Sequence, residues 1–302
     1  MALAAPSELS FLLAVLIEGV LAGAIYALIA LAFVLVYKCS RMVNFAVGEW
    51  IMAGALAAGL GYSALGLGAA GAIVFAALAM AAFGLAFNAV VVRRLAAGPV
   101  ISLIMVTLGL GALMRGVSAL IFAGVPAGVP LPLPAEPLLI DGVPLAPEKL
   151  VAAVAALAAV AAVTWLYGHT RTGLALRAIA DDRQAAVAMG INVDRHFGLV
   201  WAVTGIVSMT AGILWVLVTG GGFGVALVGL KVFPIVVIGG LDSIPGTIVA
   251  AVLIGMVESL GSVYLDPLLG GGFGTMASYL LLLAMLMVRP NGLFGRPPAV
   301  RV

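Results

Sequence analysis

Apolar runs of about 20 residues recur along the whole chain, and each is long enough to cross a ~30 Å hydrocarbon core as an α-helix. Hydrophobic residues make up 65% of the chain and charged residues 9%, unlike a soluble domain. The runs do not alternate in polarity, which excludes the strands of a transmembrane barrel. They lie near residues 11–37, 43–60, 69–92, 100–122, 149–167, 197–218, 231–240, 245–263 and 274–288. The sequence therefore predicts an all-α polytopic membrane protein with eight or nine transmembrane helices.

The basic residues between the runs predict which side of the membrane each loop faces. Under the positive-inside rule, loops rich in Lys and Arg are cytoplasmic. Four basic groups share one side if the N-terminus is outside: Lys38 and Arg41, Arg93 and Arg94, the cluster from Arg171 to Arg195, and Arg289, Arg296 and Arg301. Residues 124–149 then form an external, proline-rich loop in which Lys149 is the lone basic residue. We expect one transmembrane domain over residues 1–302, with nine crossings and a cytoplasmic C-terminus.

One segment is polar in an otherwise apolar chain. RTGLALRAIADDRQAAVAMGINVDR, from Arg171 to Arg195, carries four arginines and three aspartates and lies in the predicted cytoplasmic loop of residues 168–196. Arg177 and Asp181 stand at i and i+4 of a predicted helix. Its alanines leave a surface that another protein could approach closely. The same pattern also fits an amphipathic helix at the membrane surface.

Capping residues mark the ends of this polar helix. Thr172 is a plausible N-cap, the stretch Leu174–Met189 has helix-forming composition, and Gly190 suits the C′ position. Asn192 or Asp194 then caps the following helix. The sequence predicts one continuous polar helix that ends at Gly190.

Three long stretches resemble a known family. RAIADDRQAAVAMGINVDR is similar to the coupling helix by which permeases of branched-chain amino acid ABC importers dock on their ATPases. GAIYALIALAFVLVYKCSRMVNFAVGEWIMAGA, Gly23 to Ala55, resembles the first signature of that family. GLKVFPIVVIGGLDSIPGTIVAAVLIGMVESL, Gly229 to Leu260, resembles its last signature. The chain is similar to the LivH type, the first of two permease subunits.

The resemblance implies a type II-like importer permease of the bacterial inner membrane that carries branched-chain or related hydrophobic amino acids. It implies a second, LivM-like permease subunit, two ATPase subunits and a soluble substrate-binding protein as partners. ATP and Mg²⁺ would be bound by the ATPases and no cofactor by this chain. The same family also carries urea, short amides and aromatic acids, so the substrate stays open.

The resemblance also implies roles for particular residues. In the coupling helix these are Arg177, Asp181, Asp182, Arg183, Ala186, Gly190, Ile191 and Asn192. One position departs from the family pattern: its NFAHGE motif reads NFAVGE here, with Val47 in place of His. An aliphatic side chain cannot titrate or donate a hydrogen bond, so any role of that His in substrate passage is not carried over.

The NFAVGE stretch contains polar groups where an apolar helix would begin or be interrupted. Ionisable groups at membrane depth are costly and therefore indicate function. We consider a translocation pathway formed by Asn44, Phe45, Val47, Gly48 and Glu49, with Gly48 permitting local unwinding. In the alternative, Asn44 only caps the second span and Glu49 pairs with Lys38 or Arg41 at the interface. Glu18, in the first span, would similarly snorkel or bond to another helix.

Residues 239–245 predict a tight turn between two short helices. Gly239 and Gly240 end the first helix, Asp242 and Ser243 are good N-caps, and Pro245 suits the first turn of the second. Asp242, Ser243 and Pro245 could form a secondary cytoplasmic contact with an ATPase. A helical hairpin that needs caps explains the same residues.

Missing motifs narrow the function. The sequence contains no G-x-x-x-x-G-K-[ST] motif for ATP phosphates, and His169 and His196 do not form a metal motif. Basic stretches with interleaved aromatic residues, which would indicate nucleic-acid binding, are also missing. We therefore expect a transport subunit and not an enzyme.

Two classes of transporter remain. In the first, the chain is half of an ABC importer pore that takes its energy from docked ATPases. In the second, it is an ion-coupled secondary transporter, a class that shows inverted repeats and intramembrane charge pairs. The charges of this sequence concentrate in one cytoplasmic segment and no clear repeat is present, which favours the importer.

Overall fold

The computed structural model describes residues 8–95, 100–122, 124–134, 136–140, 143–221 and 223–295, and almost all of its regular structure is helical. Its helices are α1 (Glu8–Ser40), α2 (Val47–Ser63), α3 (Gly68–Phe87), α4 (Arg93–Leu95), α5 (Val100–Ile121), α6 (Pro147–His169), α7 (Arg171–Asp181), α8 (Arg183–Ala188), α9 (Val193–Thr219), α10 (Val228–Gly239), α11 (Ile244–Leu260), α12 (Asp266–Leu269) and α13 (Phe273–Val288). Short π-helical turns, Asn88–Val92 and Gly261–Leu265, extend α3 and α11, and a 3₁₀ turn, Phe223–Leu227, precedes α10.

The long apolar runs form helices where the sequence predicts them. Six helices of the described chain are long and apolar enough to cross a membrane: Glu8–Ser40, Gly68–Leu95, Ile101–Ile121, Pro147–His169, Val193–Thr219 and Ile244–Leu269. Gly224–Gly239 and Phe273–Val288 are shorter apolar helices. The prediction of an all-α polytopic membrane protein is confirmed, and the count of nine crossings stays a prediction.

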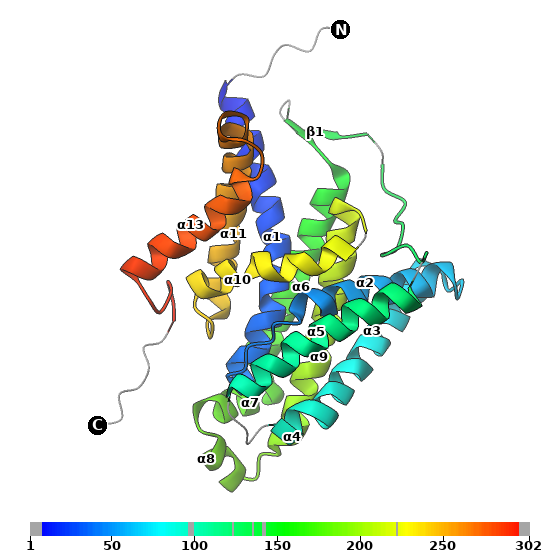
Figure 1. Cartoon of the computed structure of the whole chain (residues 1–302), viewed down its shortest axis with the longest axis vertical. Helices are drawn as coiled ribbons and strands as arrows, with labels where there is room; N and C mark the ends of the chain where they lie inside the picture. Colours follow the sequence, from blue (N-terminus) through cyan, green and yellow to red (C-terminus); the bar gives the residue numbers. More distant parts are fainter. Residues whose placement is uncertain are drawn as a thin grey trace.

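Helix α1 forms the axis of the fold. It packs along α11 and also against α6 and α9 (Figure 1). Its contact with α11 is a contact between backbones: a Cβ added to Gly19 would lie 2.6 Å from the Met256 Cα, and one added to Gly23 would lie 2.7 Å from the Val252 Cα. From the α11 side, a Cβ added to Gly255 would lie 2.3 Å from the Gly19 carbonyl oxygen. Glycines therefore let two apolar helices pack tightly, as is common in membranes.

The two ends of the molecule differ in character. α4, α7 and α8 lie at the end where α1 finishes, and the antiparallel hairpin of β1 (Leu138–Ile140) and β2 (Val143–Leu145) lies at the opposite end (Figure 1). Arg93, Arg94 and the polar segment thus share one end, as the positive-inside rule predicts. The external loop of the prediction contains the hairpin, which the sequence analysis missed. Arg296 and Arg301 lie outside the described residues.

Helix α10 is the exception among the apolar helices, because it has only 12 residues. At 1.5 Å per residue it reaches about 18 Å, less than a bilayer core. In Figure 1 it runs across the long helices rather than along them. Helix α2 is also strongly inclined in this view.

Candidate functional site

The polar segment does not form the single helix that the sequence analysis predicts. Thr170, not Thr172, caps α7 by accepting a hydrogen bond from the Gly173 N–H at 3.1 Å. α7 ends at Asp181, and Asp182 is the N-cap of a second helix, α8. The Asp182 Oδ1 accepts from the N–H groups of Gln184 at 2.8 Å and Ala185 at 3.0 Å. An aspartate that satisfies two free N–H groups favours a new helix start over continuation, so the segment bends there.

The end of the segment follows the prediction. Gly190 has a φ of 81°, in the left-handed region that glycine occupies without strain. Asn192 caps α9, because its Oδ1 accepts from the Arg195 N–H at 3.0 Å. Asp194 instead forms an ion pair with Arg93 at 3.2 Å.

The exposed surface of this segment differs from the one that the resemblance implies. Ala186 is only 3% exposed and packs inside the chain, so it cannot contact a partner directly. The exposed apolar side chains are Leu174, Val187 and Met189, with exposed fractions of 62, 57 and 83%. Asp181, Asp182, Arg183, Gly190 and Asn192 are exposed, and Ile191 is half-buried. We call the exposed tip around Val187 and Met189 the α8 tip.

Arg177 holds α7 to the end of α6. Its guanidinium donates to the carbonyl oxygens of Tyr167 at 3.1 Å and Gly168 at 3.0 Å. It also lies 5.9 Å from the centre of the Tyr167 ring, and the Lys38 ammonium lies 4.9 Å from that centre. Because Arg177 uses its donors to satisfy carbonyls at the C-terminus of α6, its role is to position α7.

A cavity of about 350 Å³ joins the polar segment to the turn between α10 and α11. Its lining comes from the end of α1, from α7, from the turn and from the C-terminal segment: Lys38, Arg41, Tyr167, Arg177, Ala180, Asp181, Asp242, Ser243, Pro245 and Phe294. The predicted coupling helix and the predicted secondary contact therefore border one site, which we call the cytoplasmic cavity because the predicted topology places this end in the cytoplasm.

The turn itself is built largely as predicted. Ser243 caps α11 by accepting from the Gly246 N–H at 3.1 Å, and Pro245 lies in the first turn of that helix. Asp242 is not a cap, since its carboxylate lies 3.9 Å from the Arg41 guanidinium. The segment after α13 packs on the turn, where the Leu293 N–H donates to the Ile238 carbonyl at 2.7 Å.

The NFAVGE stretch lies at the start of α2, whose first residue is the buried Val47. The Asn44 Oδ1 accepts from the Ala46 N–H at 3.0 Å, whereas the buried Asn44 Nδ2 has no hydrogen-bond partner among the described residues. The Phe45 ring stacks on Phe233 of α10, with centres 6.1 Å apart. The prediction that Gly48 unwinds is wrong: it is helical, and an added Cβ would lie 1.9 Å from the Ala226 carbonyl oxygen.

Glu49 has a partner that the sequence analysis did not predict. Its carboxylate lies 3.2 Å from the guanidinium of Arg115 on α5, and not beside Lys38 or Arg41. Glu49 is 7% exposed, and the missing side chain of Gly111 leaves room for its carboxylate. The pair joins α2 to α5 inside the helical region.

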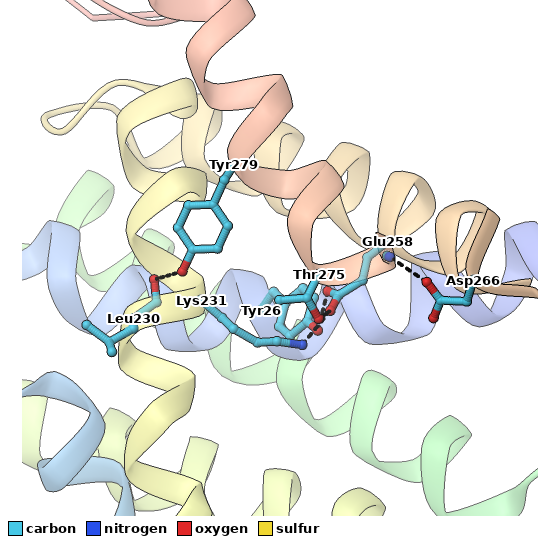
Figure 2. Close-up of polar contacts among 8 residues, drawn as sticks. Tyr26, Leu230, Lys231, Glu258, Asp266, Thr275 and Tyr279 are labelled. Atoms are coloured by element: carbon cyan, nitrogen blue, oxygen red, sulfur yellow. Dashed lines mark hydrogen bonds and ion pairs between the residues drawn. The ribbon is translucent and has the colours of Figure 1, made fainter. Parts of the chain in front are cut away.

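A second polar cluster surrounds Glu258 of α11 (Figure 2). Its Oε2 accepts from the Tyr26 hydroxyl at 2.6 Å, and its Oε1 pairs with the Lys231 ammonium and accepts from the Thr275 hydroxyl at 3.3 Å. Glu18 of α1 forms a further ion pair with Lys149 of α6. Charge pairs therefore form between the long helices as well as in the polar segment, which the sequence analysis did not predict. Lone Glu and Lys residues inside apolar runs were the signal for these pairs.

The family match and the sequence relatives agree with one another. The family described as branched-chain amino acid transport system / permease component matches residues 15–289. The chain is 28% identical to the high-affinity branched-chain amino acid transport system permease protein BraD of Pseudomonas aeruginosa, covering 95% of this chain and 97% of that one. It is 27% identical to the corresponding protein LivH of Escherichia coli, covering 94% and 96%. Among solved structures, it is similar to PsaBC from Streptococcus pneumoniae in complex with Fab, with a TM-score of 0.47 and 18% identity over 92% of each chain.

The family match covers nearly the whole chain and includes the polar segment, the α10–α11 turn and the three ion pairs Glu49–Arg115, Lys231–Glu258 and Glu18–Lys149. The membrane-spanning helices, the match and the relatives lead to one assignment: the chain belongs to the family of permease components of branched-chain amino acid transport systems.

Proposed function

We propose that this chain is one permease subunit of a binding-protein-dependent ABC importer, located in the bacterial inner membrane, and that it carries branched-chain or related hydrophobic amino acids. The observation that carries this proposal is the α8 tip, where Val187 and Met189 expose apolar surface outside the membrane-spanning helices. Exposed apolar side chains amid charged ones are typical of a docking surface for another protein.

The partners follow from the parts that this chain does not supply. Two ATPase subunits bind ATP and Mg²⁺ and dock on the α8 tip and beside the cytoplasmic cavity. A second, LivM-like permease subunit completes the pore, and a soluble binding protein delivers the substrate outside. This chain itself binds no cofactor and hydrolyses nothing.

The coupling is a shift between inward-facing and outward-facing states. ATPases bias that equilibrium only through contacts that differ between the states. Helix α8 contacts α7, and α7 borders the cytoplasmic cavity together with α1 and the α10–α11 turn, so a displacement of the α8 tip is passed to the cavity through α7. The start of α2 and its Glu49–Arg115 pair, which lie between α5 and α10, form the pathway wall in this proposal.

An ion-coupled secondary transporter is the second candidate, and the partly buried Lys231–Glu258 pair favours it. The two candidates differ in their source of energy and in their partners. The tagged chain, purified from its native membrane in mild detergent, should bring two ATPases and a second permease with it. Vesicles should then take up leucine with ATP in the presence of protonophore. Purification of the chain alone, with uptake abolished by protonophore, would establish the ion-coupled candidate instead.

A further inference from the structure

A second cavity lies at the hairpin end of the molecule, far from the cytoplasmic cavity. It has a volume of about 300 Å³ and is enclosed by α1, by the start of α6 and by the end of α9. In Figure 1, this is the end at which β2 leads into α6. We call it the outer cavity. Its volume falls at the lower end of the ~300–1,000 Å³ range of small-molecule sites.

The lining of the outer cavity contains one charge of each sign. Glu18 of α1 and Lys149 of α6 pair across it, and their side chains are 29 and 37% exposed, so each has a free side. A ligand that carries both charges can enter this pair with its own carboxylate on Lys149 and its ammonium on Glu18. Both side chains then keep an opposite charge, which avoids the cost of an unpaired, desolvated ion.

Apart from Thr219, whose hydroxyl donates to the Trp215 carbonyl at 2.9 Å, the rest of the lining is apolar and aromatic. Tyr26 and Trp215 lie with ring centres 5.9 Å apart, and Ile25 and Val218 complete the wall. The Tyr26 hydroxyl is occupied by Glu258, so the ring presents its apolar face and is held in place. The apolar part of this wall would contact a hydrocarbon side chain.

We propose that the outer cavity binds a zwitterionic amino acid with an apolar side chain, and that Lys149, Glu18 and Trp215 determine its selectivity. The proposal rests on the proposed import function and assigns a substrate site within it. A neutral amide or urea cannot replace either member of the ion pair, so the site selects against them.

The test measures access and protection at a single cysteine. The native Cys39 is buried and is first replaced, Cys39→Ala. Val218→Cys, in the complete importer in sealed right-side-out vesicles, should react with a membrane-impermeant methanethiosulfonate. Leucine at twice its dissociation constant should slow this reaction about threefold, by the factor 1 + [L]/Kd. 4-Methylpentanoate, which lacks the ammonium, and 3-methylbutylamine, which lacks the carboxylate, should give no protection at the same concentration.

The controls distinguish protection by a ligand in the outer cavity from a general effect of leucine on the protein. Glu136→Cys, exposed beside the hairpin and outside the cavity lining, should react equally with and without leucine. Lys149→Met and Glu18→Gln should each abolish protection at Val218→Cys. If Val218→Cys does not assemble, Thr219→Cys, also in the lining, takes its place.

Three results would overturn the inference: no external labelling of either cavity cysteine, labelling without protection, or equal protection by the two singly charged analogues. The proposed function is tested separately in the same vesicles. ATP-driven leucine uptake with an unprotected cavity cysteine overturns only this inference, whereas an absence of ATP-driven amino acid uptake overturns the import function.

Discussion

A substitution in the polar segment tests either docking or stability, depending on whether the side chain is exposed or buried. Ala186 is buried against the rest of the chain, whereas Met189, three residues later, is 83% exposed. Met189→Glu therefore places a charge on the α8 tip without disturbing packing, and we expect it to reduce the amount of ATPase that copurifies about tenfold, or ~1.4 kcal/mol. The melting temperature of the isolated permease should not change.

Ala186→Glu is the matched comparison. A carboxylate at this buried position is desolvated, so the permease itself should lose stability. Equal copurification of ATPase by wild type and Met189→Glu would show that the α8 tip is not the docking surface.

The Glu49–Arg115 pair gives the second prediction at this scale. Arg115→Met leaves the buried Glu49 carboxylate without its cation, and we expect a loss of about 2 kcal/mol, below the value for a fully buried pair because Arg115 is half exposed. The double variant Glu49→Gln with Arg115→Met should recover most of that loss in thermal denaturation. Additive losses would mean that the two side chains do not interact.

Local chemistry explains which residues could be placed from the sequence. The capping roles of Asn192 and Ser243 and the positive φ of Gly190 depend only on residues within a turn, and all three predictions are confirmed. The partner of Glu49 lies on a different helix, and nothing near Glu49 in the sequence points to it. Ion pairs between helices that are far apart in the sequence depend on how those helices pack, and helix packing cannot be predicted from a single sequence.

Among the elements, α8 depends on one side chain. Asp182→Ala removes the acceptor for the N–H groups of Gln184 and Ala185, and such a cap contributes about 1 kcal/mol. We expect faster amide hydrogen exchange in residues 183–188, with α7 unaffected. Asp182→Asn, which keeps an acceptor oxygen, should exchange at nearly the wild-type rate, and unchanged exchange in the alanine variant would rule out the cap.

Helix α10 lacks one backbone hydrogen bond, and a side chain of α13 replaces it. Pro234 has no N–H to donate to the Leu230 carbonyl four residues earlier, and the Tyr279 hydroxyl donates to that oxygen instead, at 3.3 Å (Figure 2). Tyr279→Phe should therefore cost about 1 kcal/mol of stability. Pro234→Ala restores the helical N–H, so Tyr279→Phe should cost nothing in that background. An equal cost in both backgrounds would show that the hydroxyl is not needed for this carbonyl.

The helices could be predicted from the sequence wherever an apolar run was long enough to span a membrane. Each long apolar run became a helix within a few residues of its predicted bounds, because backbone groups in lipid must be satisfied within the helix. The break at Asp182 was missed because helix-forming alanines on both sides conceal it. The inclination of α2 and α10 was also missed, since hydropathy does not encode direction.

For the molecule as a whole, the separation of its two ends can be measured. In sealed right-side-out vesicles that contain the permease without ATPases, Glu136→Cys near the hairpin should react with an impermeant thiol reagent. Arg183→Cys on α8 should react only after the membrane is permeabilised. Both side chains are exposed in the fold, so a difference in labelling reports sidedness. The reverse pattern would invert the predicted topology.

The glycine contact between α1 and α11 has a mechanical consequence. Glu18 is adjacent to Gly19, where the backbones of α1 and α11 touch. We therefore expect the α1 wall of the outer cavity to stay fixed relative to α11. Lys149 and Trp215 stand on α6 and α9, the two helices that the polar segment connects at the opposite end. A displacement of the polar segment is thus transmitted directly to α6 and α9. We expect the outer cavity to widen or narrow by displacement of α6 and α9 past a stationary α1.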